Sequence, residues 1–230
     1  MLILGIDASA KTASVGIMEN DKMIVNFTLN HKRTHSEKLL EMIDMALSIA
    51  KCDISDIDAF AVCKGPGSFT GLRIGLSTVK GLCHALNKPC FLTSTLSMLY
   101  ENVRGSFDDG ALYVPVMDAR RNEVYTAIFK DGEKILSDSA MPIFELIEII
   151  DKTDINAKVV FVGDGVLPNI DIIKDHFKDR VSFADECHNY GSGYSVITSA
   201  LKENESVTYD KILPTYLRVS QAERMKKKEN

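Results

Sequence analysis

The sequence has no C-x-x-C pair, no long apolar run and no excess of positive charge. Its five cysteines stand mostly in apolar contexts such as GLCHAL, which is typical of small buried side chains in a reducing compartment. The start MLILGID contains an Asp and no basic region, so it predicts neither a signal peptide nor a membrane span. With 27 Lys and Arg against 32 Asp and Glu, the net charge of −5 provides no overall attraction to nucleic acid or membranes. We therefore expect a soluble, cytoplasmic protein that does not bind membranes.

Two blocks of the chain have the same order of short apolar segments. Residues 2–29 contain LILGIDAS, TASVGIME and KMIVNFTL, and residues 112–137 contain LYVPVMDA, EVYTAIFK and KILS. Each block predicts three strands joined by polar turns. Asp7 ends the first strand of one block and Asp118 that of the other, each 13 residues before a polar residue of the second turn. The matched order and offset indicate a duplicated domain.

Helical and strand patterns alternate after each block, which predicts an α/β protein. The stretch RGSFDDG at 104–110 is the natural boundary. We expect an N-terminal lobe at 1–105 that docks a partner, and a C-terminal lobe at 106–230 whose last helix is free to pack back on the first lobe. A β-meander followed by helix–strand units, twice over, fits the two-lobed fold shared by actin, Hsp70 and sugar kinases (the ASKHA fold).

In that fold ATP lies between the lobes, and an Asp-bearing hairpin from each lobe faces its phosphates. Both predicted hairpins carry polar side chains and turn N–H groups that suit an anion, and the turn VGDG would lie on the adenosine side. Ordinary polar turns explain the same residues, so both interpretations stay open. The candidate nucleotide-binding residues are Asp7, Ser9, Lys11, Asp118, Arg120, Gly163 and Gly165.

The stretch KGPGSFTGLR at 64–73 has the composition of a phosphate-binding loop but not its spacing. A P-loop needs Lys and then Ser or Thr after its last glycine, where this chain has Leu and Arg. A dinucleotide-binding loop needs a third glycine where this chain has Thr70. The Gly-Pro-Gly turn instead predicts a sharp end to a buried strand, followed by a helix at 69–86 with a hydroxyl residue as its cap.

Gly71 and Gly75 lie inside this predicted helix. Each glycine costs a helix about 1 kcal/mol relative to alanine, so several of them suggest that another backbone comes close along that side. That backbone belongs either to a partner, which makes the helix a docking surface, or to the protein's own sheet. Periodicity alone does not decide between the two, and we take the docking surface as the hypothesis.

Five motifs together resemble the TsaB (YeaZ) family, from residue 1 to about residue 224: GIDAS…ASVGI, HSEKLL, KGPGSFTGLRIGL…KGL, MDARRNEVY and PTYLRVSQAE. This family provides the partner subunit of the catalytic subunit TsaD in bacterial biosynthesis of the tRNA modification threonylcarbamoyladenosine. The resemblance implies the ASKHA fold and a scaffold that performs no catalysis itself.

The resemblance also implies particular partners. TsaD would bind through the helices at 35–51 and 69–86, and a TsaE-like ATPase would join at the junction. tRNA would be reached through the complex. Without TsaD the chain is either a homodimer or a monomer, and both alternatives stay open. The candidate partner-binding residues are Leu39, Ile43, Gly71, Leu72, Gly75, Leu76 and Val79.

TsaD holds a metal through an H-x-x-x-H pair, and Thr95 and Leu99 stand where those histidines would be. His31 and His35 lie in a different predicted element. The resemblance therefore implies no metal and no intrinsic cofactor, with ATP or ADP at most in the complex. Two alternatives are an autonomous ATP-dependent enzyme built on the two hairpin aspartates, and a peptidase, for which no nucleophile or metal set is visible.

Overall fold

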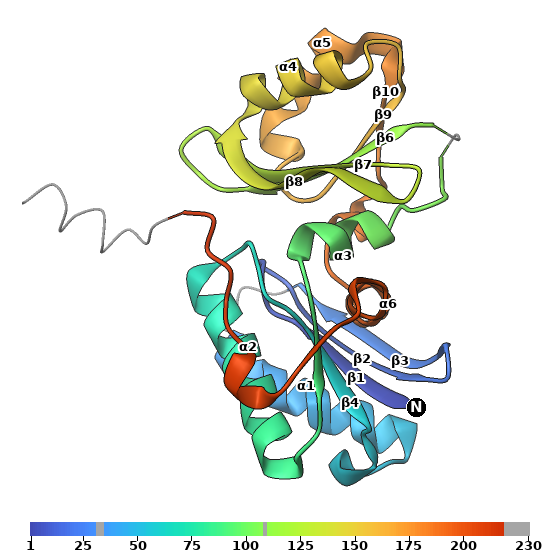
Figure 1. Ribbon diagram of the computed structural model, residues 1–230, viewed down its shortest axis with the longest axis vertical. Coiled ribbons are helices and arrows are strands. Elements are labelled where there is room, and N and C mark those ends of the chain that lie inside the picture. Colours follow the sequence, from blue (N-terminus) through green and yellow to red (C-terminus); the bar gives the residue numbers. More distant parts are fainter. Residues whose placement is uncertain (31–34, 108–109, 219–230) are drawn as a thin grey trace, which may run out of the picture.

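Two β-sheets form the centres of two lobes (Figure 1). The computed structural model describes residues 1–30, 35–107 and 110–218, without the side chains of residues 35–37. His31 and the side chain of His35 lie outside the described residues.

The first sheet has six strands in the order β11-β5-β4-β1-β2-β3. The first three strands form an antiparallel meander, and β4 and β5 extend it in parallel from the other side of β1. All five residues of β4, AFAVC, are buried, because helices cover both faces of the sheet at this point. The strands are β1 (Leu2–Asp7), β2 (Ala13–Glu19), β3 (Lys22–Leu29), β4 (Ala59–Cys63), β5 (Cys90–Thr93) and β11 (Glu205–Val207).

The second sheet repeats this arrangement in the order β10-β9-β6-β7-β8, with an antiparallel meander and parallel β9 and β10. The predicted duplication is therefore confirmed. Asp7 and Asp118 make the same turn in the two lobes: Oδ1 accepts the N–H of Ser9 at 2.9 Å in one and of Arg120 at 2.7 Å in the other. The strands are β6 (Leu112–Asp118), β7 (Glu123–Lys130), β8 (Glu133–Pro142), β9 (Val159–Val162) and β10 (Val181–Phe183).

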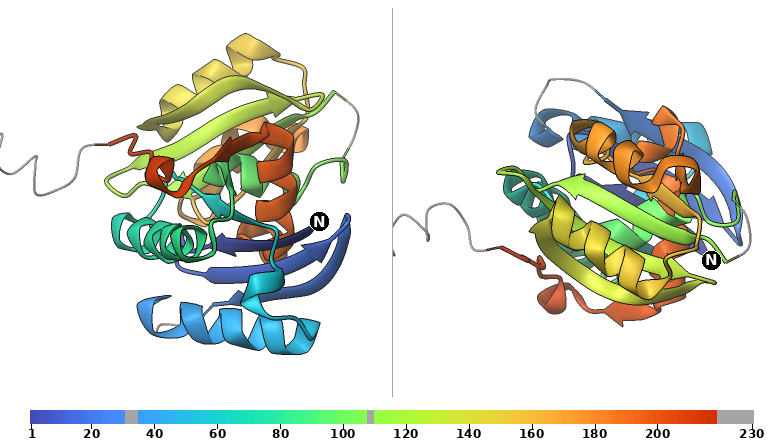
Figure 2. Two further views of the ribbon diagram at one scale, coloured as in Figure 1. Left: turned by 60° about the horizontal axis from the view of Figure 1, so that its bottom comes forward. Right: turned by 90° about the horizontal axis from the view of Figure 1, so that it is seen from above.

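The helices form three layers around the two sheets. α1 (His35–Ala50) and α2 (Phe69–Leu86) cover the outer face of the first sheet, and α4 (Ile143–Thr153) and α5 (Ile170–Phe177) cover that of the second. α3 (Thr95–Glu101) and α6 (Gly193–Glu203) lie between the lobes, where apolar residues of both sheets pack against them. Figure 2 shows the same layering from two other directions.

The chain returns to the first lobe after Gly191. α6 packs on β1, β2, β4 and β5, and β11 pairs antiparallel with β5. The Oγ of Ser14 donates a hydrogen bond of 2.6 Å to the carbonyl oxygen of Gly191, which joins residues 177 positions apart. The first lobe therefore consists of the residues before about 105 together with α6 and β11, which come from the end of the chain.

The predicted helix at 69–86 is confirmed, but its glycines contact the protein's own lobe. A Cβ on Gly71 would collide with the carbonyl oxygen of Ala8, and one on Gly75 would lie 3.4 Å from the Cβ of Ala8. The close backbone is therefore that of the β1–β2 hairpin. This corrects the hypothesis that these two glycines admit a partner helix.

The apolar residues assigned to the partner are likewise part of the first lobe's core. All five are buried against the sheet, with exposed fractions between 0% and 4%. An amphipathic helix on a sheet turns its apolar stripe inward, so the stripe itself is unavailable for docking. The corrected residues are Leu39, Ile43, Leu72, Leu76 and Val79.

Candidate functional site

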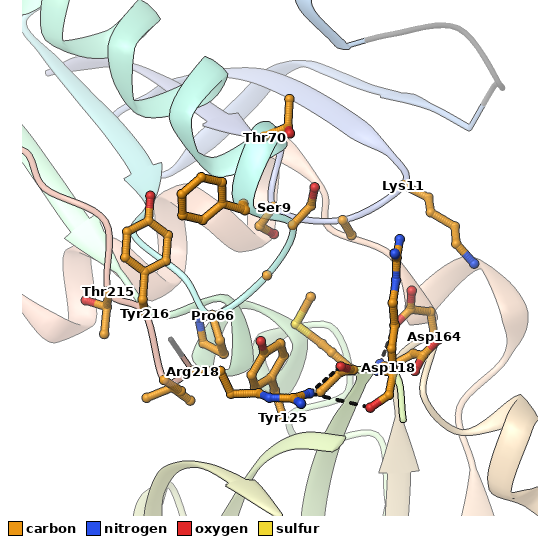
Figure 3. Close-up of a pocket in the computed structure, with 18 of the residues that line it drawn as sticks. Ser9, Lys11, Pro66, Thr70, Asp118, Tyr125, Asp164, Thr215, Tyr216 and Arg218 are labelled. Atoms are coloured by element: carbon orange, nitrogen blue, oxygen red, sulfur yellow. Dashed lines mark hydrogen bonds between the residues drawn. The ribbon is translucent and has the colours of Figure 1, made fainter. Parts of the chain in front are cut away.

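A cleft of about 610 Å³ opens between the lobes (Figure 3). The β1–β2 hairpin and the N-terminus of α2 line one side of it. The β6–β7 hairpin, Tyr125 and Asp164 line the other, and residues 215–218 of the C-terminal segment complete the wall. The cleft thus lies where the two halves of the duplicated fold face each other.

The structure brings together only part of the predicted nucleotide-binding set. Ser9, Lys11, Asp118 and Arg120 line the cleft. Asp7 is fully buried beside the Gly191 loop. Burial raises the pKa of the Cys63 thiol, and the negative charge of Asp7 raises it further.

Gly163 and Gly165 are not among the described residues that line the cleft. Both pack against β6: a Cβ on Gly165 would lie 2.7 Å from the carbonyl carbon of Met117, and one on Gly163 would collide with the carbonyl oxygen of Val116. The structure therefore uses these two glycines for a close backbone crossing.

Asp164 is a cleft residue that the sequence did not reveal. Burial raises the pKa of its carboxyl group, while the hydrogen bond of 3.2 Å from the N–H of Asp118 and the charge of Lys11 act in the opposite direction. Because its neighbour in sequence is a glycine that packs on β6, Asp164 is held at the cleft wall by backbone packing. A lone Asp in a turn carries no signal for such a position.

We expect Asp164→Asn to stabilise the protein at neutral pH. A raised folded-state pKa means that the folded chain binds more protons than the unfolded chain, so the ionised carboxylate costs stability above the folded-state pKa. The cost is absent below the unfolded pKa of about 4, where both states are protonated. Thermal melts at pH 7 should show a gain of up to about 1 kcal/mol, or about 2–4 °C, that vanishes near pH 3.

Asn still accepts the Asp118 N–H, so the substitution isolates the charge. Asp175→Asn, at an exposed position of α5, is a control with the same change of charge. A variant Asp164→Asn that melts lower than the wild type at pH 7 would contradict the interpretation.

The C-terminal segment joins the two lobes across the cleft. On the first lobe, the N–H of Thr215 donates to the carbonyl oxygen of Lys64 at 2.7 Å, and the ring of Tyr216 stacks on Phe69 at 4.9 Å. On the second lobe, Arg218 donates to the carbonyl oxygen of Ala119 at 2.6 Å and pairs with Glu123. These contacts are long-range, and the motif PTYLR alone does not predict them.

A second surface lies on the outer side of α1 and α2. Leu40, Met45 and Ile49 of α1 are 56–58% exposed. On α2, a Cβ placed on Gly81 would meet no atom within 4 Å. A signal for this surface is present in the sequence, since α1 has more apolar residues than one buried stripe requires. We call this surface, defined by Leu40, Met45, Ile49 and Gly81, the outer helical face.

Thr95 and Leu99, at the positions compared with metal-binding histidines, lie in α3 and are buried between the lobes. Within the described ranges, no three or more His, Cys, Asp or Glu side chains gather closely enough to hold a metal ion. No helix in the described part of the chain is both long and apolar enough to span a membrane.

Comparisons with known proteins agree on one family. A family model described as TsaD, tRNA N6-adenosine threonylcarbamoyltransferase, matches residues 22–225. The tRNA threonylcarbamoyladenosine biosynthesis protein TsaB of Bacillus subtilis is 30% identical over 229 residues, 97% of this chain and 96% of that protein.

Solved structures show the same relationship. The structure of YeaZ from Pseudomonas aeruginosa is 25% identical and covers 94% of this chain and 99% of its own, with a TM-score of 0.71. The ROK hexokinase of Thermus thermophilus is 11% identical and covers 89% of this chain and 100% of its own at a TM-score of 0.53, which confirms the ASKHA fold. The chain therefore belongs to the TsaB (YeaZ) family of tRNA threonylcarbamoyladenosine biosynthesis proteins.

Proposed function

We propose that this protein is a non-catalytic subunit that binds and activates a TsaD-like threonylcarbamoyltransferase in the cytoplasm. The observation that supports it best is the outer helical face. Three large apolar side chains stand exposed on a helix whose other side is packed in the core, and no other described element covers them. Met45 and Ile49, four positions apart, share one side of α1, and exposed apolar residues that share a surface mark a contact with another protein.

Two helices side by side on a sheet offer a partner a flat, ridged layer. A matching helix pair would pack on it at interaxial distances of about 8–10 Å. Gly81 lets a partner helix approach closely, and Leu40, Met45 and Ile49 supply apolar area of the kind found in the centres of interfaces. The same surface would support a homodimer when the TsaD-like partner is absent.

The remaining assignments follow from this role. A TsaE-like ATPase joins where the two subunits meet, ATP or ADP binds in the assembled complex, and tRNA is bound by the complex. No metal is expected at the position of the TsaD histidine pair, because Thr95 and Leu99 lack metal-binding groups of the kind that a histidine pair provides.

The alternative, an autonomous ATP-dependent enzyme, makes the opposite prediction for Asp118. In a reconstituted modification assay with a TsaD-like and a TsaE-like protein, Asp118→Asn should retain activity within about twofold, because Asn still accepts the turn hydrogen bond. Omitting the chain altogether should abolish modification. A loss of about 100-fold or more for Asp118→Asn, with pairing intact, is what a catalytic carboxylate would produce and would contradict the proposal.

A further inference from the structure

The β6–β7 hairpin carries two arginines on an unusual backbone. Arg120, Arg121 and Asn122 have φ angles of 62°, 59° and 61°, three consecutive residues in the left-handed region. Asn adopts this region readily, whereas Arg does so rarely. Both arginine side chains are exposed, and neither forms a hydrogen bond or ion pair with any residue that the structure describes. The backbone of this turn is held by local hydrogen bonds, from the N–H of Arg120 to Asp118 and from the N–H of Glu123 to the carbonyl oxygen of Arg120, whereas the two arginine side chains take no part in them. Backbone strain of this kind is a common mark of a functional position.

The cleft beside this hairpin differs in charge from the rest of the molecule. Lys11, Arg120, Arg121 and Arg218 line it against only two carboxylates, Asp118 and Asp164, whereas acidic residues outnumber basic ones in the whole chain. Arg218 is already paired with Glu123. The other three cations line the cleft and form no ion pair with any residue that the structure describes.

Two further features inside the cleft suit an anion. The Oγ of Ser9 is fully buried and makes no hydrogen bond with any described residue, although Ser9 is part of the lining. The N-terminus of α2, an 18-residue helix capped by Ser68, opens on the same space. Helix N-termini carry N–H groups and partial positive charge that attract phosphate. The site therefore combines a buried donor, a helix N-terminus and free cations.

An aromatic surface adjoins these groups. Tyr216 lines the cleft (Figure 3) and is 41% exposed. Its ring stacks on Phe69, and its OH accepts a hydrogen bond of 3.0 Å from Arg73. The guanidinium of Arg73 in turn lies 3.7 Å from the centre of the Phe69 ring. The hydrogen bond and the stack hold Tyr216 in place with much of it open to solvent. Exposed aromatic rings next to cations are the arrangement on which single-stranded nucleic acids stack their bases.

We propose that the cleft mouth binds single-stranded RNA. Lys11, Arg120 and Arg121 contact backbone phosphates, and Tyr216 stacks on an unpaired base. The inference rests on the proposed function, because α2 has its N-terminus in the cleft and carries Gly81 of the outer helical face near its other end. α2 would therefore connect a partner bound at the outer helical face to the cleft. Single strands fit better than duplexes, since only an unpaired base presents its face for stacking.

The test uses Arg120→Asn/Arg121→Asn in the full chain, alone and assembled with a TsaD-like partner. Asn removes both charges and suits the left-handed turn, so the melting temperature should stay unchanged or rise. Binding of a fluorescein-labelled anticodon stem-loop RNA is followed by anisotropy from about 50 to 200 mM salt. We expect about tenfold weaker binding at low salt, and a plot of log K against log salt whose slope is smaller by about 1.4, or about 0.7 for each lost phosphate contact.

Lys152→Gln/Lys174→Gln is the matched control, because it removes the same charge from α4 and α5 on the far side of the second lobe. This variant should leave the slope unchanged. Tyr216→Ala should weaken binding about tenfold at an unchanged slope, since it removes stacking and no charge. Leu213→Ala, at a residue of the same segment that is 62% exposed, controls for general loosening of that segment and should have little effect.

The proposal is overturned if the arginine variant and the lysine control change the slope equally. It is also overturned if inorganic tripolyphosphate, and not RNA, is the ligand whose binding depends on Arg120 and Arg121, because the site would then serve a free phosphate compound. Pairing with the TsaD-like protein is measured on the same samples by size exclusion. Failure of the wild type to pair counts against the proposed function, whereas normal pairing with an unchanged salt slope counts against RNA binding alone.

Discussion

Gly81→Leu is expected to abolish binding to a TsaD-like partner while leaving the isolated chain folded and slightly more stable. A Cβ at Gly81 meets nothing within 4 Å, so the side chain has space in the monomer. Replacing a helical glycine should raise the free energy of unfolding by about 1 kcal/mol. In a complex whose helices pack at about 8–10 Å, however, a leucine at this position would force the two layers apart. Thermal melts and size-exclusion or calorimetric binding measurements on the same sample separate the two effects.

Two companion variants sharpen this experiment. Met45→Glu places a charge on the outer helical face at a residue that is 56% exposed, and should also prevent pairing without lowering the melting temperature. Phe144→Glu makes a comparable change at a residue that is 64% exposed on α4 of the other lobe, and should pair normally. If Gly81→Leu and Met45→Glu both bind the partner with wild-type affinity, the outer helical face is not the docking surface.

Gly193→Ala is expected to destabilise the protein strongly, although it adds only one methyl group. Here the first residue of α6 crosses β2 backbone against backbone: a Cβ on Gly193 would lie 2.7 Å from the carbonyl carbon of Val15 and closer still to Gly16. A Cβ on Gly16 would in turn lie 2.7 Å from the Cα of Gly193. Neither side of this contact is a flexible side chain that could move away. Overpacking costs typically 1–3 kcal/mol and more where nothing can yield, so we expect about 3 kcal/mol or more, or roughly 6–12 °C in the melting temperature.

The matched control is Gly81→Ala, which adds the same methyl group to a helix at an open position and should be stabilising. Gly71→Leu, like Gly193→Ala, should lower the free energy of unfolding, because its Cβ would collide with the carbonyl oxygen of Ala8. Both variants should lose binding to a partner only as a consequence of unfolding. A Gly193→Ala protein that melts within 1 °C of the wild type, on the order of a few tenths of a kcal/mol, would show that α6 does not cross β2 this closely.

Gly71 and Gly75 of α2 show which features the sequence predicts and which it does not. Its composition correctly indicated a helix at 69–86 and a close backbone approach at Gly71 and Gly75. Whether that backbone belonged to a partner or to the protein itself depended on which side of the helix faced the sheet. Periodicity identifies an apolar stripe but not its neighbour, and the stripe turned out to face the β1–β2 hairpin and the core.

The cleft shows the same division. Ser9, Lys11, Asp118 and Arg120 come together as expected, because each lies on a hairpin that the repeat places at the same end of its sheet. Asp7 makes the same turn as Asp118 but is buried, since the Gly191 loop covers it from a distant part of the chain. No pattern within either hairpin distinguishes the two aspartates.

Local pattern therefore determined the strands of the two meanders, the long helices, the duplicated order of the two lobes and the turns that the two aspartates make. These features depend on residues a few positions apart, through strand alternation, helical periodicity and turn chemistry. Only the tertiary structure decided which faces are buried, that α6 and β11 return to the first lobe, and that Tyr216 and Arg218 complete the cleft. Those outcomes depend on contacts between residues that are far apart in the sequence, such as Ala8 and Gly71 or Ser14 and Gly191. The free energy of these contacts comes from burying surface against elements that the local sequence does not contain.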